Sequence, residues 1–155
     1  WADGVVKIGS LKDDRAECEE FASAFIDYVY AFDEGTVLFK PTKCSDVQFR
    51  PTKPQAASYF IAGPQTMYPE DKGFAITPWT KVKFENNNIL LETNRAIATG
   101  NYWFTDVNGN EAKVEYTFGY KLTADGKLKI DLHHSSFPYA PAPAPAPAAK
   151  ELEMA

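Results

Sequence analysis

The side chains best suited to chemistry lie next to one another in the segment HHSS, residues 133–136. His133 and His134 are the only two histidines in the chain, and Ser135 and Ser136 follow them. An imidazole can exchange a proton near neutral pH or bind a metal ion, and a serine hydroxyl both donates and accepts hydrogen bonds. The segment therefore predicts metal ligands, acid–base groups, or simply the buried end of a strand.

The sequence limits the metal sites that this chain could form. A three-histidine zinc site is excluded because the chain has only two histidines. Neighbouring strand residues point to opposite faces, so His133 and His134 would converge on one ion only at a bulge. Cys18, Cys44 and one histidine could supply a set of three ligands, and the two cysteines could also pair. The pattern instead indicates a buried thiol and a loop thiol, so we expect no bound metal.

Side chains alternate between the two faces of a strand, and this alternation predicts which residues of HHSS face inward. His134 and Ser136 share a face with the apolar residues Leu128, Ile130 and Leu132, so we expect them to point into the core. His133 and Ser135 then share the outer face with Lys129 and Asp131. One bulge near the end of the strand would reverse this assignment.

Two helices and a short strand are predicted in the first half of the chain. Residues 10–35 indicate a long amphipathic helix, which opens with Ser10 and Asp13 at capping-box spacing and ends at Gly35. Its apolar face is expected to contain Cys18, Phe21, Phe25, Tyr28, Val29 and Phe32. Residues 36–42 predict a strand, and residues 54–63 predict a short helix with Pro54 at its first position.

The second half of the chain is predicted to be nearly all strand. WTKVKFE and ILLET flank the turn signal NNN, and RAIATGNYWFTD and AKVEYTFGYKL flank VNGNE. The last strand, LKIDLHHSS, follows the turn TADGK. Helices followed by a meander of antiparallel strands predict an α+β fold. The long helix should cover a strongly curved sheet, which leaves a cone with an open mouth where a pocket can form.

Composition predicts one folded domain followed by a spacer. The 155 residues are 45% hydrophobic and carry a net charge of −5, which suits one well-packed domain. The 16 basic residues form no run, so we expect no nucleic-acid or membrane partner. Residues 140–149 read APAPAPAPAA, which favours extended polyproline II. We therefore expect a domain over residues 1–139 and a linker or tail over 140–155. The start at Trp1 indicates a processed or excised piece.

Five segments carry a resemblance to a known family over roughly residues 10–139. They are VLFKPT, QFRPT, SYF, GNYWFTD and YTFGYKLTADGKLKIDLHHSSFPY. The predicted order of elements resembles the nuclear-transport-factor-2-like fold, which includes the association domain of calcium/calmodulin-dependent kinase II. Together, the segments resemble the iota-class carbonic anhydrases of algae, cyanobacteria and other bacteria.

The resemblance implies reversible hydration of CO2 to bicarbonate. It places Thr42, Tyr59, one histidine of HHSS and the serine two residues later in a small bicarbonate pocket. Thr42 and the serine would hold oxygen atoms, Tyr59 would orient CO2, and the histidine would accept the proton. Without the resemblance, Thr42 is read as a turn hydroxyl and Tyr59 as a core aromatic. Zinc or manganese remains the alternative to a metal-free site.

The resemblance also implies a homodimer, further linked copies of the domain, and a plastid or other algal organelle as location. Two other functions on this fold stay open. One is a non-catalytic association domain. The other is a polyketide-type isomerase or cyclase, which needs a base in a larger apolar pocket.

Overall fold

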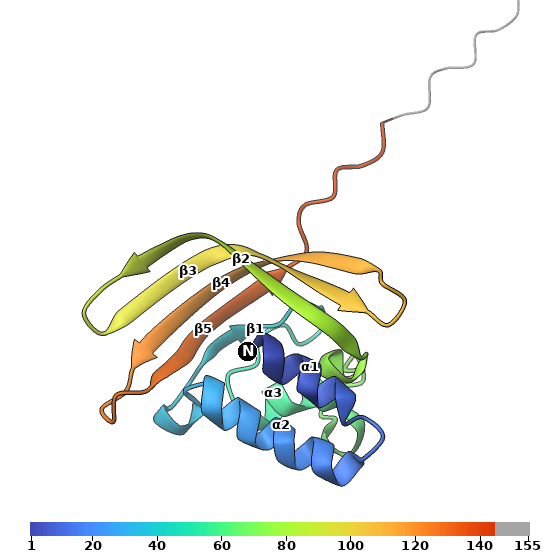
Figure 1. Cartoon of the computed structure of the whole chain (residues 1–155), viewed down its shortest axis with the longest axis horizontal. Coiled ribbons are helices and arrows are strands. Elements are labelled where there is room, and N and C mark those ends of the chain that lie inside the picture. Colours follow the sequence, from blue (N-terminus) through green and yellow to red (C-terminus); the bar gives the residue numbers. More distant parts are fainter. Residues whose placement is uncertain (145–155) are drawn as a thin grey trace, which may run out of the picture.

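Three α-helices cover one face of a curved five-stranded sheet in this computed structural model, which describes residues 1–144 (Figure 1). The helices are α1 (Ala2–Ser10), α2 (Arg15–Val29) and α3 (Lys53–Ile61). The strands are β1 (Leu38–Lys40), β2 (Trp79–Leu91), β3 (Arg95–Asp106), β4 (Glu111–Leu122) and β5 (Leu128–Ser136). The predicted α+β fold is confirmed.

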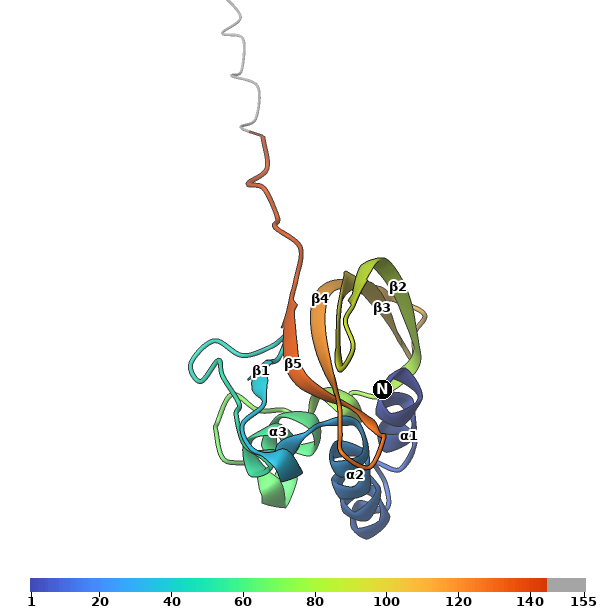
Figure 2. The same ribbon diagram turned by 90° about the vertical axis from the view of Figure 1, so that its left-hand side faces the viewer.

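The sheet has the strand order β1-β5-β4-β3-β2. Strands β2 to β5 form an antiparallel meander, and β1 adds to the edge of the sheet parallel to β5. Figure 2 shows the sheet from the side, curving above the helices. The register of the parallel pair places Phe39 opposite His133. Strand β1 therefore brings the turn that contains Thr42 next to the HHSS segment.

The predicted helix over residues 10–35 is wrong in its bounds. Ser10 ends the separate helix α1, and α2 begins at Arg15 with Asp14 as its cap, whose carboxylate accepts from the Glu17 N–H at 3.1 Å. The predicted apolar face is partly correct, because Cys18 and Phe25 are buried whereas Tyr28 is 77% exposed.

Helix α1 was missed because two glycines weaken its helical signal. Its Val5 and Ile8 are fully buried. A Cβ on Gly4 would lie 2.2 Å from the Phe25 ring. The glycine therefore lets α1 pack directly against α2, and packing stabilises what propensity does not.

The predicted turn at NNN is also wrong. Asn86, Asn87 and Asn88 lie inside the continuous strand β2, where the register with β3 shifts between Asn86 and Asn88. The chain turns instead between Leu91 and Arg95. A β-bulge absorbs the polar run without ending the strand.

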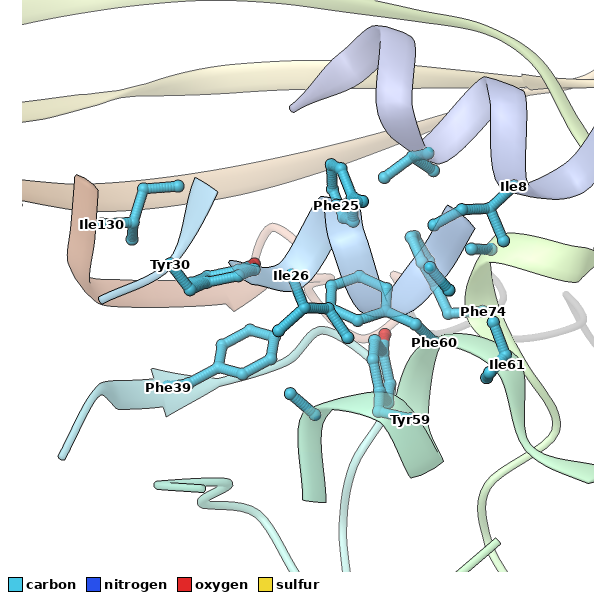
Figure 3. Packing of buried hydrophobic residues seen from close by; sticks show 14 of the residues in the cluster. Ile8, Phe25, Ile26, Tyr30, Phe39, Tyr59, Phe60, Ile61, Phe74 and Ile130 are labelled. Atoms are coloured by element: carbon cyan, nitrogen blue, oxygen red, sulfur yellow. The ribbon is translucent and has the colours of Figure 1, made fainter. Parts of the chain in front are cut away.

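Aromatic side chains fill the space between the helices and the sheet. Figure 3 shows Tyr30, Phe39 and Phe60 lying together in this core. The rings of Phe39 and Phe60 stack with centroids 5.9 Å apart. The thiol of Cys18 is part of the same core, as predicted, and both cysteines are free. Tyr116, Phe118 and Tyr120 of β4 also face this space.

After β5, residues 137–144 leave the sheet without helix or strand (Figure 1). The rest of the predicted linker, residues 145–155, lies outside the described residues, so the linker stays a prediction. Within residues 1–144, no helix combines the length and apolar composition needed to cross a bilayer.

Candidate active site

The structure reverses the predicted orientation of the HHSS segment. His133 and Ser135 are buried, with 2% and 1% exposure. His134 is exposed, and the Ser136 hydroxyl points to Glu115 on the outer face, at 3.4 Å. The prediction that His134 and Ser136 face inward is therefore wrong.

A bulge in β5 is the cause of this reversal. Gly119 pairs with Leu132 and the next residue, Tyr120, pairs with Ile130, so Asp131 is an extra residue. The Arg95 guanidinium donates two hydrogen bonds to the Asp131 carboxylate, at 2.7 and 3.0 Å. A Cβ on Gly119 would lie 2.7 Å from the Leu132 Cβ. The absent side chain thus makes room for the bulge, and the ion pair holds it.

The two inward side chains of HHSS, His133 and Ser135, belong to a continuous chain of hydrogen bonds. The Trp1 indole donates to the Tyr30 hydroxyl at 2.9 Å, and that hydroxyl lies 2.7 Å from His133 Nδ1. His133 Nε2 lies 3.1 Å from the Tyr102 hydroxyl, which is 2.5 Å from Ser135 Oγ. Ser135 Oγ in turn lies 2.6 Å from Thr42 Oγ1. Six side chains from five regions of the chain are therefore connected.

Thr42 and Tyr59 lie at the outer end of this chain. Thr42 is half-buried, Tyr59 is 4% exposed, and the Lys43 N–H donates to the Tyr59 hydroxyl at 3.2 Å. Burial raises the pKa of Tyr59, and the nearby Thr42 hydroxyl offsets a small part of this rise. Of the six predicted site residues, the structure brings together Thr42, Tyr59, His133 and Ser135. It does not bring in His134 or Ser136.

The loop after Thr42 is anchored by a buried ion pair and by a carboxylate nearer the surface. The Arg50 guanidinium donates two hydrogen bonds to the Asp71 carboxylate, each 2.8 Å, and both side chains are fully buried. Close by, the Glu70 carboxylate accepts from the backbone N–H groups of Ser45, Asp46 and Val47 at 2.7–3.0 Å. Both contacts join the loop to residues 70–71, which keeps Thr42 in place beside Ser135.

Burial sets the protonation states of the site. It lowers the pKa of His133 to about 3, with a smaller contribution from His134. It raises the pKa of the Tyr30, Tyr59 and Tyr102 hydroxyls well above their ordinary value. At neutral pH the site therefore consists of neutral hydroxyls and a neutral imidazole.

The imidazole of His133 is held between two aromatic rings. It stacks on Phe118 at 4.0 Å and on Phe39 at 4.9 Å between centroids. Lys40, next to Phe39, donates to the Ser135 carbonyl oxygen at 2.9 Å. The orientation of His133 and Ser135 is thus fixed by packing and by the edge strand β1.

Sequence reasoning missed Trp1, Tyr30 and Tyr102. The alternation of GNYWFTD does place Tyr102 on the same face as Phe104, which is a usable signal. Tyr30 follows the last turn of α2, and Trp1 precedes α1. Their contact with each other depends on how the helices pack, which no local pattern records.

In residues 1–144, no group of three or more His, Cys, Asp or Glu side chains comes together as a candidate metal site. Cys18 packs against α1, where its thiol lies 3.8 Å from the Ile8 carbonyl oxygen, and Cys44 lies in the loop after Thr42. The described residues therefore do not form the two-cysteine, one-histidine set.

Comparisons with known proteins agree on one family. Residues 1–137 match the family model described as metal-independent carbonic anhydrase. A protein of that name from a Nostoc species is 39% identical over 142 residues, which cover 90% of this chain and 69% of the relative.

Solved structures give the same result. The crystal structure of an iota-carbonic anhydrase from a cyanobacterium, complexed with bicarbonate, matches with a TM-score of 0.85 at 38% identity. The match covers 91% of this chain and 87% of the other. A nuclear transport factor 2-like protein from Salmonella enterica has a TM-score of 0.53 at 14% identity, covering 94% and 93% of the two chains, and shares the fold alone.

Proposed function

We propose that this chain, which belongs to the metal-independent carbonic anhydrase family, hydrates CO2 reversibly to bicarbonate beside Thr42. The observation that carries this assignment of the site is the convergence of Thr42, Tyr59 and Ser135 at the end of a buried chain of neutral groups. Family membership favours this reaction over the association-domain and isomerase alternatives.

The low pKa of His133 argues against its expected role as proton acceptor. A base that is protonated only near pH 3 gains little by taking a proton from water at neutral pH. The site therefore needs a route that uses neutral hydroxyls, and Thr42 supplies one.

In this route, the oxygen of a water molecule bonds to the carbon of CO2 while the Thr42 hydroxyl relays a proton. The water gives a proton to Thr42 Oγ1, and Thr42 gives its own hydroxyl proton to a CO2 oxygen. The product is carbonic acid, which then loses a proton to solvent, and Thr42 is restored. No hydroxide ion and no buried cation form. The rate advantage comes from holding both reactants in attack geometry.

Tyr59 has a complementary role. Its hydroxyl oxygen accepts from the Lys43 N–H, so its own hydrogen can be donated to an oxygen of CO2 or bicarbonate. Because its pKa is raised, it donates as a neutral phenol. A donor aimed at an oxygen of CO2 stabilises the negative charge that this oxygen gains in the transition state.

The two serines of HHSS provide a matched test of this site. We expect Ser135→Ala to lower kcat by about ten- to a hundredfold, since it interrupts the hydrogen bonds to Thr42. Ser136→Ala, one residue away on the outer face, should keep wild-type activity. The measurement is stopped-flow CO2 hydration after exhaustive chelation. Equal effects of the two substitutions, or activity that returns only with added metal, would contradict the proposal.

We further propose that the chain forms a homodimer through the outer face of the sheet. The strand registers align an apolar row across this face, on the side away from the helices (Figure 2). The row consists of Leu90, Ile97, Gly119, Leu132 and Leu38. Leu90 and Leu38 are 66% and 65% exposed. Further copies joined through the Ala-Pro run are part of the same proposal, supported by its composition.

A pair of isoleucines on the β2–β3 hairpin tests the dimer. Ile97→Glu should raise the dimer dissociation constant at least about tenfold, because two-fold symmetry brings two charges into the contact. Ile89→Glu is the control, since Ile89 pairs with the inward residue Ala98 and lies on the opposite face. Size-exclusion chromatography with light scattering gives the mass. A wild-type chain that stays monomeric, or a dimeric Ile97→Glu, would refute this surface.

A further inference from the structure

We infer that Trp1 and Tyr30 are positioning residues, which fix the direction of the hydrogen-bond chain so that each group in it donates toward Thr42. The direction follows from the structure alone. Its consequence for catalysis rests on the proposed function.

The direction is set at the buried end of the chain. An indole N–H can only donate, so the Trp1–Tyr30 bond uses a lone pair of the Tyr30 oxygen. Within residues 1–144, the Tyr30 hydroxyl has hydrogen bonds only to Trp1 and His133. Tyr30 is fully buried, so its own hydrogen must be donated to Nδ1 of His133 to be satisfied.

This bond determines the tautomer of His133. The imidazole is neutral, because burial strongly disfavours its charged form. With Nδ1 accepting from Tyr30, the single ring hydrogen is on Nε2 and is donated to the Tyr102 oxygen. Tyr102 then donates to Ser135, and Ser135 donates to Thr42, because each hydroxyl has one hydrogen to give.

The opposite direction fails at Tyr30. If Thr42 donated inward, His133 would accept at Nε2 and donate from Nδ1 to Tyr30. The Tyr30 oxygen would then accept two hydrogen bonds, and its hydroxyl hydrogen would have no acceptor in the core. In the outward direction the Tyr30 hydroxyl hydrogen has an acceptor, Nδ1 of His133.

The outward direction matters at Thr42, where the chain ends. With Ser135 donating to Thr42 Oγ1, the hydrogen of Thr42 is left for a reactant bound beside it. An oxygen of CO2 or bicarbonate accepts such a hydrogen, and it would be repelled by an oxygen lone pair. Four hydrogen bonds link Tyr30 to Thr42. Through them, Trp1 and Tyr30 keep the Thr42 hydroxyl oriented as a donor toward the reactants, which is how the proposed relay starts.

The tautomer can be measured independently of activity. In two-dimensional ¹H–¹⁵N spectra that connect ring nitrogens to ring protons, we expect His133 of the wild type to be the Nε2–H form, with His134→Gln used for assignment. Tyr30→Phe removes the donor to Nδ1 and should give mixed tautomers with a kcat lowered about ten- to fiftyfold. Trp1→Phe, which frees the Tyr30 lone pair, should move both readouts in the same direction.

Tyr120→Phe is the matched control, because it removes the hydroxyl of another inward tyrosine that is not part of the chain. It should keep the Nε2–H tautomer and wild-type kcat. An Nδ1–H form in the wild type would overturn the inference. Mixed tautomers with unchanged kcat in Tyr30→Phe would overturn the positioning role. A wild type with the Nε2–H form but no CO2 hydration would instead refute the proposed function and leave the direction of the chain intact.

Discussion

Replacing Thr42 by valine is expected to lower kcat for CO2 hydration by about a hundred- to a thousandfold. Valine has nearly the shape of threonine but cannot donate or accept a hydrogen bond. It would remove the hydroxyl on which the chain from His133 through Tyr102 and Ser135 ends. In the proposed route the same hydroxyl relays the proton. Its loss therefore removes both a hydrogen-bond donor to an oxygen of CO2 and the path of the proton.

Two companion variants make this result specific. Thr42→Ser keeps the hydroxyl and should restore activity to within about tenfold of wild type, with the difference arising from looser positioning. Tyr59→Phe should lower kcat less than Thr42→Val, because Tyr59 donates but is not the relay. A Thr42→Val enzyme that keeps full activity after chelation would show that the reaction takes place elsewhere or by another route.

The sequence allowed most of the sheet to be predicted but not the face on which the site lies. The segments RAIATGNYWFTD and LKIDLHHSS have the same bounds as β3 and β5. Alternation is a local property, so the strands could be read directly. The bulge at Asp131 is not local, because it needs Arg95 from β3 and the space above Gly119 on β4. Because of this one extra residue, His133 and Ser135 point into the core in place of His134 and Ser136.

The candidate site also contains some residues that could be predicted from the sequence and others that could not. Thr42 and Tyr59 were found because their motifs resemble those of a family, and spacing alone would have given a turn hydroxyl and a core aromatic. Tyr30 lies 103 residues from His133 along the chain. A contact of this kind exists only after α2 has packed beneath the sheet, so no pattern in either segment could predict it.

The buried, neutral state of His133 has a second measurable consequence, which concerns stability. The pKa of His133 is about 3 in the folded chain, and the unfolded value is about 6.5. Between these values the unfolded chain binds a proton that the folded chain does not, so the free energy of unfolding rises with pH and falls on acidification. Where His133 is fully protonated in the unfolded chain and neutral in the folded chain, the free energy of unfolding changes by about 1.4 kcal/mol per pH unit.

Between pH 7 and pH 5 this residue alone should therefore lower the free energy of unfolding by about 2 kcal/mol. Carboxylates contribute little in this window, because they titrate near pH 4 in unfolded chains. Urea unfolding of wild type and His133→Gln at both pH values measures the effect. The variant should lose about 2 kcal/mol less than wild type over the same interval, whatever its stability at pH 7. His134→Gln, which removes the exposed imidazole, should keep the wild-type dependence. If His133→Gln also kept it, the imidazole would be able to take up a proton in the folded chain. In that case a histidine base would again be a sound explanation of how water loses its proton.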